Sequence, residues 1–210
     1  MLTLIKACED ELIEKKSRFI ALAAPAASEQ QALEVIASVR QQHSTATHHV
    51  YAYLIAASDN AGEIQRFNDA GEPSGTAGRP VLEVLKRLGL QNVVVVVTRY
   101  FGGILLGAGG LTRAYSTAAS HVLSKAEMGE AEPAALCQIS FDYAFLPVAE
   151  RLLAGNGCVI REKLFLQEVT LTCLLPLVSK GLVLRRLSEA FGGALHYFML
   201  SERELLIKKI

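Results

Sequence analysis

The sequence lacks the features that would place it in a membrane or in an oxidising compartment. Its longest nearly apolar run, around Val93–Thr98, is far too short to cross a bilayer. Its first residues show no basic region followed by a long apolar stretch, so no signal peptide is expected. Only four cysteines occur, and no two of them form a Cys-x-x-Cys pair. We therefore expect reduced thiols in a cytoplasmic protein, with neither a disulfide framework nor a zinc site.

Net charge is also lacking, because 21 basic residues balance 21 acidic ones. This balance argues against strong non-specific binding to nucleic acid. Between Arg66 and Arg113, however, six basic residues stand against three acidic ones, which leaves open either a local positive patch or a mixed solvated surface. Apolar residues are abundant, at 51% of the 210 residues, and this is enough for a packed core.

Helical and extended patterns alternate over the first 130 residues or so. Ser28-Glu29-Gln30-Gln31 matches a capping box, and apolar residues at helical spacing follow it. Five consecutive valines within Asn92–Arg99 are typical of a strand buried on both faces. The other expected elements are an early strand or hairpin over Glu14–Ala24, a strand over His48–Ile55, a long irregular segment over Ala57–Arg79, a helix from Pro80 to Gly89, and a helix that follows Gly110 and ends near Met128.

The pattern changes near Gly129–Pro133, where small and acidic residues interrupt the periodicity. This change predicts two domains, residues 1–130 and 131–210. In the second domain we expect a strand over Cys137–Tyr143, a helix over Pro147–Leu153, strands over Cys158–Phe165 and Glu168–Leu175, a helix over Leu177–Phe191 and a last strand over Ala194–Ile207. The order β-α-β-β-α-β is that of a ferredoxin-like unit, so the predicted fold class is α+β.

A strand, a glycine-rich loop and a helix follow one another over Val93–Tyr115. Free amides at the start of the helix can hold an anion, and neighbouring arginines can add bidentate phosphate contacts. Neither a P-loop nor a dinucleotide loop is complete, since Ala108 stands in place of the lysine and Thr112 in place of the last glycine, and no cofactor is expected. Alternatively, the glycines only permit tight packing of the helix on a sheet. The expected phosphate-binding residues are Arg79, Arg99, Gly102, Gly103, Gly107, Gly109, Gly110 and Arg113.

The polar loop Phe67–Pro80 is the second candidate, as a site for a polar ligand or a divalent cation, or as a structural turn. It has no evident nucleophile–base pair. His48 and His49 are neighbours on a strand and point to opposite faces, so they are not expected to chelate one ion, and no metal is predicted. Lys15, Lys16 and Arg18 are interpreted as part of a solvated strand. The supporting residues of the site are Asp69, Glu72, Ser74, Thr76, His48, His49 and Tyr100.

Two glycine-rich segments together resemble the signature of the IMPACT/YigZ family. The first segment is Gly71–Pro80, and the second runs from Arg99 through Gly107-Ala108-Gly109-Gly110 to Tyr115. Lys16-Ser17-Arg18-Phe19 and His48-His49 also fit its N-terminal pattern. Ala70 departs from the family, which usually has a second acidic residue after Asp69, and this weakens a metal-binding reading of the loop.

The resemblance implies a fold and a cellular context. It implies an N-terminal domain like the second domain of ribosomal protein S-five and a C-terminal domain like the late domains of elongation factor G, and both folds occur in the translation machinery. We therefore expect a translation-linked protein that binds RNA or a ribosomal component, more a binding protein than an enzyme. The alternatives are a small-molecule enzyme of the phosphotransferase kind and a protein–protein adaptor. We also expect the two glycine-rich segments to meet in space.

Overall fold

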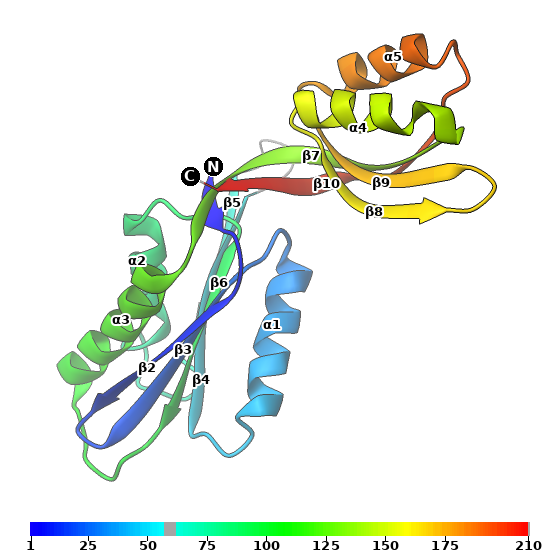
Figure 1. Cartoon of the computed structure of the whole chain (residues 1–210). Helices are drawn as coiled ribbons and strands as arrows, with labels where there is room; N and C mark the ends of the chain where they lie inside the picture. The colour runs from blue at the N-terminus through cyan, green and yellow to red at the C-terminus, as the bar shows by residue number, and fades with distance from the viewer. Residues whose placement is uncertain (57–61, 210) are drawn as a thin grey trace. The chain divides into compact units, whose positions relative to one another are not determined.

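The protein forms two compact units. The structure is a computed structural model, and it describes residues 1–56 and 62–209. The first unit spans Met1–Glu130 and takes in the end of the chain from Lys208, and the second spans Ala131–Ile207. Both units combine helices with sheets, so the predicted α+β class is confirmed (Figure 1).

An antiparallel sheet of five strands forms the centre of the first unit. Its order is β2 (Cys8–Glu14), β3 (Ser17–Pro25), β6 (Val93–Tyr100), β4 (His48–Ala56) and β5 (Glu63–Asn68). The run of five valines lies in β6, the middle strand, and every one of these valines is fully buried. A strand with neighbours on both sides and helices on both faces needs apolar side chains throughout, as the sequence predicts.

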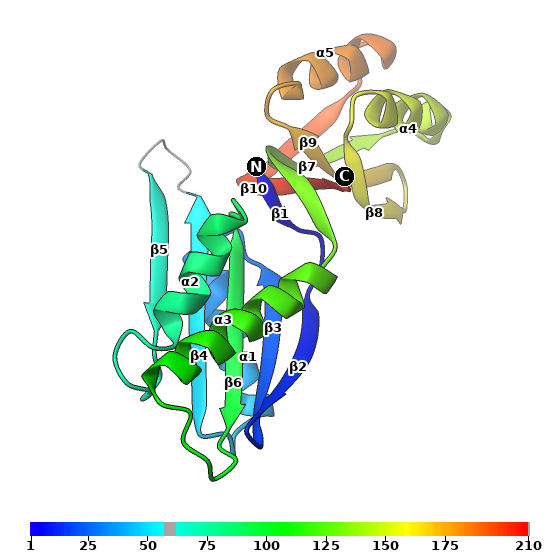
Figure 2. The same cartoon turned by 90° about the vertical axis from the view of Figure 1, so that its left-hand side faces the viewer.

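Helices cover both faces of this sheet. In Figure 2, α2 (Gly78–Arg87) and α3 (Ala108–Lys125) cross the near face, and α1 (Glu29–Gln42) lies behind the sheet. Alternate valines of β6 contribute to two cores, Val95 and Val97 on the α2–α3 side and Val94 and Val96 on the α1 side. The short strand β1 (Leu2–Leu4) pairs with Met128–Glu130.

The capping box at the start of α1 is confirmed. Ser28 Oγ accepts a hydrogen bond from the Gln31 amide, and Gln31 Oε1 accepts one from the Ala27 amide. The first hairpin is confirmed too, with its turn at Lys15 and Lys16. Both lysines have positive φ angles, 46° and 64°, which is the backbone that a two-residue hairpin turn requires.

The prediction of a long irregular segment over Ala57–Arg79 is wrong for Glu63–Asn68, because these residues form the strand β5. Residues 57–61 of that segment lie outside the described residues. As the edge strand, β5 buries little of its side chains and needs no apolar alternation, so its polar composition hid it. In the structure, β5 pairs with β4 in an antiparallel ladder. The register runs from Tyr51 opposite Asn68 to Ala56 opposite Glu63.

The second unit has the predicted order β-α-β-β-α-β. Its elements are β7 (Met128–Phe141), a single 3₁₀ turn (Tyr143–Phe145), α4 (Leu146–Gly155), β8 (Val159–Phe165), β9 (Val169–Pro176), α5 (Lys180–Ala190) and β10 (His196–Lys209). The strands lie in the order β10-β7-β9-β8, which is that of the ferredoxin-like fold. Alternate residues of β7, such as Ile139 and Phe141, pack with the helices.

All four cysteines are free thiols, and Cys137, Cys158 and Cys173 are buried in the second unit. Burial raises the pKa of the Cys173 thiol to about 12, so it is a poor nucleophile. Within the described ranges, none of the helices combines the length and the apolar character that crossing a membrane requires.

Candidate functional site

The two glycine-rich segments meet at one end of the first unit's sheet. In the strand register, His48 at the start of β4 lies opposite Arg99 near the end of β6, and Arg18 at the start of β3 lies opposite Tyr100. The first segment leads from β5 into α2, and the second leads from β6 into α3. Both lie at the same end of the sheet (Figure 2). Glu72 of the first segment and Arg99 of the second are in contact, which confirms the expectation that the segments lie together.

A buried carboxylate holds the two segments to each other. Glu72 Oε1 accepts hydrogen bonds from Arg99 Nη1 and from the Tyr115 hydroxyl, each at 2.7 Å. Glu72 is 8% exposed, Arg99 4% and Tyr115 0%. Burial and the bond to Glu72 raise the pKa of Tyr115 far above its ordinary value, so its hydroxyl remains a proton donor.

Two further side chains extend this cluster. Ser17 Oγ accepts hydrogen bonds from Arg99 Nη2 at 3.3 Å and from the Gly102 amide at 3.1 Å. His48 Nδ1 lies 2.9 Å from the Ala70 carbonyl, which can only accept, so Nδ1 is the donor in this bond. His48 Nε2 lies 3.8 Å from Glu72 Oε1. We refer to Ser17, His48, Glu72, Arg99 and Tyr115 as the Glu72 cluster.

Arg99 is therefore not placed to contact phosphate directly. Its guanidinium lies between the rings of Phe19 and Phe101, with centroids 5.4 and 5.3 Å away, and its charge is paired with Glu72. Its buried Nε has no hydrogen-bond partner in the part of the chain that the structure describes. The position suits support of the overlying loops, so we assign Arg99 a positioning role.

Asp69 is engaged inside the first loop in the same way. Its Oδ2 accepts from the Gly75 amide at 2.8 Å, and its Oδ1 accepts from the amides of Ala77 and Gly78 at 3.1 and 2.8 Å. Asp69 thereby caps α2 from a distance, because the N-cap residue Ala77 has no side chain that could do so. Neither Asp69 nor Glu72 is left open for a metal, and the described residues contain no group of side chains that could hold one.

Asp69→Ala is expected to lower the free energy of unfolding by about 2 kcal/mol, the upper end of the range for a lost helix cap, because three amides lose their acceptor. Urea denaturation measures this change. The control is Ser74→Ala on the same loop, since Ser74 is exposed and its hydroxyl makes no hydrogen bond within residues 1–56 and 62–209. Equal stability of both variants would refute the capping role. Thr76 also bonds locally, to the Pro73 carbonyl at 2.6 Å.

The glycines of the second segment divide into two kinds. A Cβ on Gly102 would lie 2.1 Å from the Lys16 carbonyl carbon, so Gly102 permits close packing of the loop on the hairpin turn. Gly109, in the first turn of α3, is exposed and would meet nothing within 4 Å. Gly103 and Gly107 have φ angles of 81° and 71° and turn the chain into α3, whose start has no side-chain cap. The packing alternative thus holds for Gly102, and an open backbone surface remains around Gly109.

Four exposed cations surround these loops: Lys15, Lys16, Arg79 and Arg113. We call them the cation set. None of their charged groups makes an ion pair or hydrogen bond to any described residue. Other cations of the same unit do have partners, since Lys6, Arg66, Lys86 and Lys125 each lie within 4.0 Å of a carboxylate oxygen. In a chain of zero net charge, four cations without a bonded partner therefore gather at the end of the sheet that carries the two segments, where Glu14 is the acidic neighbour of Lys15.

Two of the remaining predicted residues, Tyr100 and His49, form hydrogen bonds with other side chains. The Tyr100 hydroxyl lies 3.0 Å from His43 Nδ1, and His49 Nδ1 lies 3.3 Å from Thr98 Oγ1. Burial lowers the pKa of His49, which favours a neutral ring. Gly110 lies on the side of α3 that faces Leu106. Ser17 and Tyr115 were not among the predicted site residues, although both stand in the segments that carry the family resemblance, and a buried tyrosine hydroxyl beside a glycine-rich loop is a signal that a polar partner is close.

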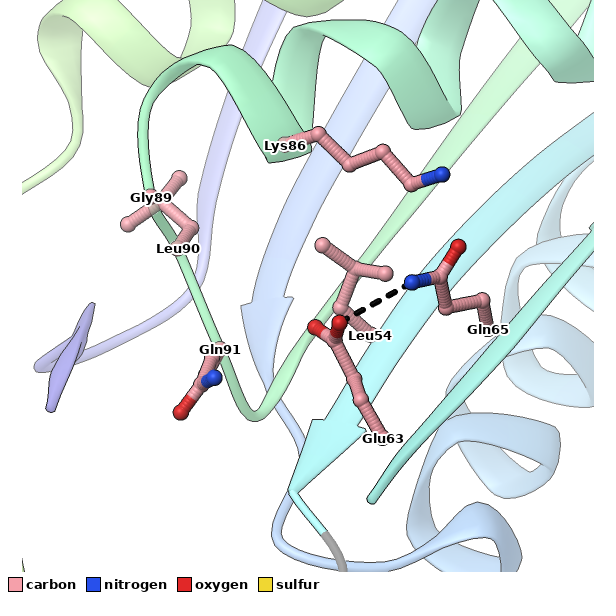
Figure 3. A pocket seen from close by; sticks show the side chains of 7 residues that line it. All are labelled: Leu54, Glu63, Gln65, Lys86, Gly89, Leu90 and Gln91. Carbon is pink, nitrogen blue, oxygen red and sulfur yellow. Dashed lines mark hydrogen bonds between the residues drawn. The ribbon is translucent and has the colours of Figure 1, made fainter.

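A separate pocket lies at the opposite end of the sheet. It encloses about 370 Å³ and is lined by Leu54, Glu63, Gln65, Lys86, Gly89, Leu90 and Gln91 (Figure 3). It lies at the end of the sheet where Leu54 pairs with Val93. That pair is six residues along each strand from the His48–Arg99 pair. None of the predicted site residues lines it.

Known proteins are similar to this chain in sequence. The model of the Impact N-terminal domain matches residues 15–123, a range that contains the whole Glu72 cluster. The chain is 44% identical to the IMPACT family member YvyE of Bacillus subtilis over 76% of its length and 72% of that protein. It is 33% identical to the IMPACT family member YigZ of Escherichia coli over 90% of its length and 92% of that protein.

Two solved structures match this chain to different extents. A crystal structure of a hypothetical protein shares 31% identity, covers 96% of this chain and 97% of its own, and superposes with a TM-score of 0.64. The structure of Yih1, described as a two-domain translational regulator, covers 60% of this chain and 47% of its own at 28% identity, with a TM-score of 0.37.

Proposed function

The chain belongs to the IMPACT family, and from this premise we propose that it is a translation-linked binding protein that recognises RNA, alone or as part of a ribosomal component. The cation set is the observation that carries this proposal, because four unpaired cations on one surface of a neutral chain suit a polyanion. The amides at the open start of α3 and the exposed Phe101 ring are further contacts for phosphate and base. We place this activity in the cytoplasm, where ribosomes are.

The two carboxylates of the first loop are engaged within the fold, and this favours a binding protein over an enzyme. A phosphotransferase would need Asp69 or Glu72 to hold a metal ion or to accept a proton. Both carboxylates instead stabilise the fold, one by capping α2 and the other by pairing with Arg99. Ser74 has no described histidine bonded to its hydroxyl, so no nucleophile–base pair forms in this loop.

RNA binding measured across a salt series tests the proposal. For single strands, the logarithm of the binding constant falls with the logarithm of the salt concentration by about 0.7 for each phosphate that is neutralised. Changing Lys15, Lys16, Arg79 and Arg113 to glutamine is therefore expected to lower the steepness of that dependence by roughly 3 and to weaken binding at low salt. Fluorescence anisotropy with a labelled single-stranded RNA measures both quantities.

The matched control changes four paired cations of the same unit, Lys6, Arg66, Lys86 and Lys125, to glutamine. It removes the same charge, and the salt dependence of RNA binding should stay close to that of the wild type. The same loss in both variants would show that only total charge matters. Absence of RNA binding by the wild type at any salt concentration would overturn the proposal.

A protein partner is the second candidate, and one observation favours it. The tip of the second loop exposes apolar side chains beside the cation set, with Ile104 41% and Leu105 82% exposed. Exposed apolar side chains that lie together are common where proteins dock. A wild type that binds no RNA would direct the search to a protein that contacts this tip.

A further inference from the structure

A second pocket adjoins the cation set, between the end of β2 and the first three turns of α3. It encloses about 270 Å³. We call it the β2–α3 slot. Leu12, Leu106 and Ala114 line it with apolar atoms, and all three also pack on the core of the first unit. Gly110 and Ala114 lie one helical turn apart on α3, and their small size leaves the slot open on the helix side.

Charged groups of both signs line the slot as well. Lys15 and Arg113, two members of the cation set, and the acidic residue Glu14 belong to its lining. All three residues are exposed, and none of their side chains is paired with another described residue. An apolar surface beside a few unsatisfied polar groups is the usual composition of a small-ligand site.

We propose that the β2–α3 slot receives one unstacked nucleotide of a bound RNA strand, and that it prefers guanine. The inference rests on the proposed function and names the part of RNA that this surface reads. The base lies on Leu12, Leu106 and Ala114, and the phosphate on the side of the base lies between Lys15 and Arg113. Single-stranded RNA is read in this manner, through bases that leave the stack and expose their pairing edges.

The base preference follows from Glu14. An ionised carboxylate only accepts hydrogen bonds, and it accepts two in parallel. Guanine presents two adjacent donors on its pairing edge, N1–H and N2–H, which match both oxygens. Uracil presents one donor between two carbonyl groups, whereas adenine and cytosine each place an acceptor beside a donor. Those three bases would bring an acceptor against the carboxylate, and each is therefore disfavoured.

The size of the slot agrees with a single nucleotide. Pockets for drug-sized ligands measure about 300–1,000 Å³, and the slot, at about 270 Å³, lies just below that range. It has room for one base and part of its sugar. The strand on either side would continue over the exposed surface, where Lys16 and the open start of α3 lie.

Titration of the whole protein with mononucleotides tests the slot separately from RNA binding. We expect GMP to bind more tightly than UMP, CMP and AMP, and to shift the amide resonances of Gly110 and Thr117, which both line the slot. Glu14→Gln should weaken GMP binding by about tenfold, because one matched acceptor becomes a donor. The control is Glu9→Gln on the same strand, which removes the same charge from an exposed residue. Because side chains alternate along a strand, Glu9 lies on the opposite face of the sheet from Leu12 and Glu14.

The possible results distinguish the guanine preference of the β2–α3 slot from RNA binding by the whole protein. A preference for GMP that Glu14→Gln removes and Glu9→Gln keeps would support the slot. Equal binding of all four mononucleotides, or no effect of Glu14→Gln, would overturn it. Binding of RNA without any mononucleotide binding in the slot would overturn the inference and leave the proposed function standing. GMP binding at the slot without RNA binding would overturn the proposed function and leave the slot as a site for a free guanine nucleotide.

Discussion

Arg99→Ala is expected to lower the free energy of unfolding of the first unit by about 3–5 kcal/mol, because the change leaves the Glu72 carboxylate buried without a counter-charge. Glu72 is 8% exposed and would keep the Tyr115 hydroxyl as its donor, which cannot neutralise a full charge. The change also removes the guanidinium from between the rings of Phe19 and Phe101, so a cavity adds to the loss.

Hydrogen exchange of the β6 amides is the suitable measurement, since β6 is the buried middle strand and reports on this unit alone. Arg18→Ala is the matched control on the adjacent strand. Its guanidinium makes two hydrogen bonds of 2.9 Å to Glu11, yet the pair is exposed, so its loss should cost about 0.2–1 kcal/mol. If both variants lost the same small stability, the Glu72 cluster would not be the support that its geometry indicates.

The comparison of the two arginines shows which part of the site the sequence could predict. Glycine spacing and the run of valines identified the strand, the loop and the helix, because these signals are local in the chain. The pairing of Arg99 with Glu72 joins residues 27 positions apart, and the hydrogen bond of Arg99 to Ser17 joins residues 82 apart. No periodicity or spacing reports such contacts, so Arg99 resembled a free phosphate ligand.

Two other features were hidden for different physical reasons. The sequence left the role of Asp69 open between a ligand-binding loop and a structural turn, because a carboxylate in a glycine-rich loop fits either role, and only the three amides around it show the cap. The lysine pair in the first turn gave no turn signal, because glycine and asparagine are the residues that usually adopt positive φ, whereas here Lys15 and Lys16 do. This turn then places both lysines, unpaired, beside the loop that follows β6.

Gly102→Ala is expected to lower the free energy of unfolding by about 3 kcal/mol, at the upper end of the range for overpacking. The added Cβ would lie 2.1 Å from the Lys16 carbonyl carbon, 2.2 Å from its oxygen and 2.4 Å from the Ser17 nitrogen. All three are backbone atoms in a tight turn, so no side chain can rotate away to make room. The turn or the loop has to move, and the hydrogen bond from the Gly102 amide to Ser17 Oγ would be lost with it.

Gly109→Ala is the matched control, seven residues further along the same segment. Its Cβ would meet nothing within 4 Å, and the residue lies in α3, so the variant should gain about 0.5–1 kcal/mol from helix propensity. Urea denaturation measures both changes. A Gly102→Ala protein as stable as the wild type would show that the loop yields easily and does not hold the hairpin turn in place.

RNA binding by Gly102→Ala shows whether RNA affinity depends on the positions of the four cations or only on their number. The variant keeps all four members of the cation set, but it shifts Lys15 and Lys16 relative to Arg113, because the added methyl group pushes on the backbone that carries them. If affinity depends on spacing, RNA binding falls at low salt although no charge has been removed, and Gly109→Ala binds as the wild type does. If affinity depends only on the local density of positive charge, Gly102→Ala loses stability and keeps its RNA affinity, and the glycine would then serve the fold alone.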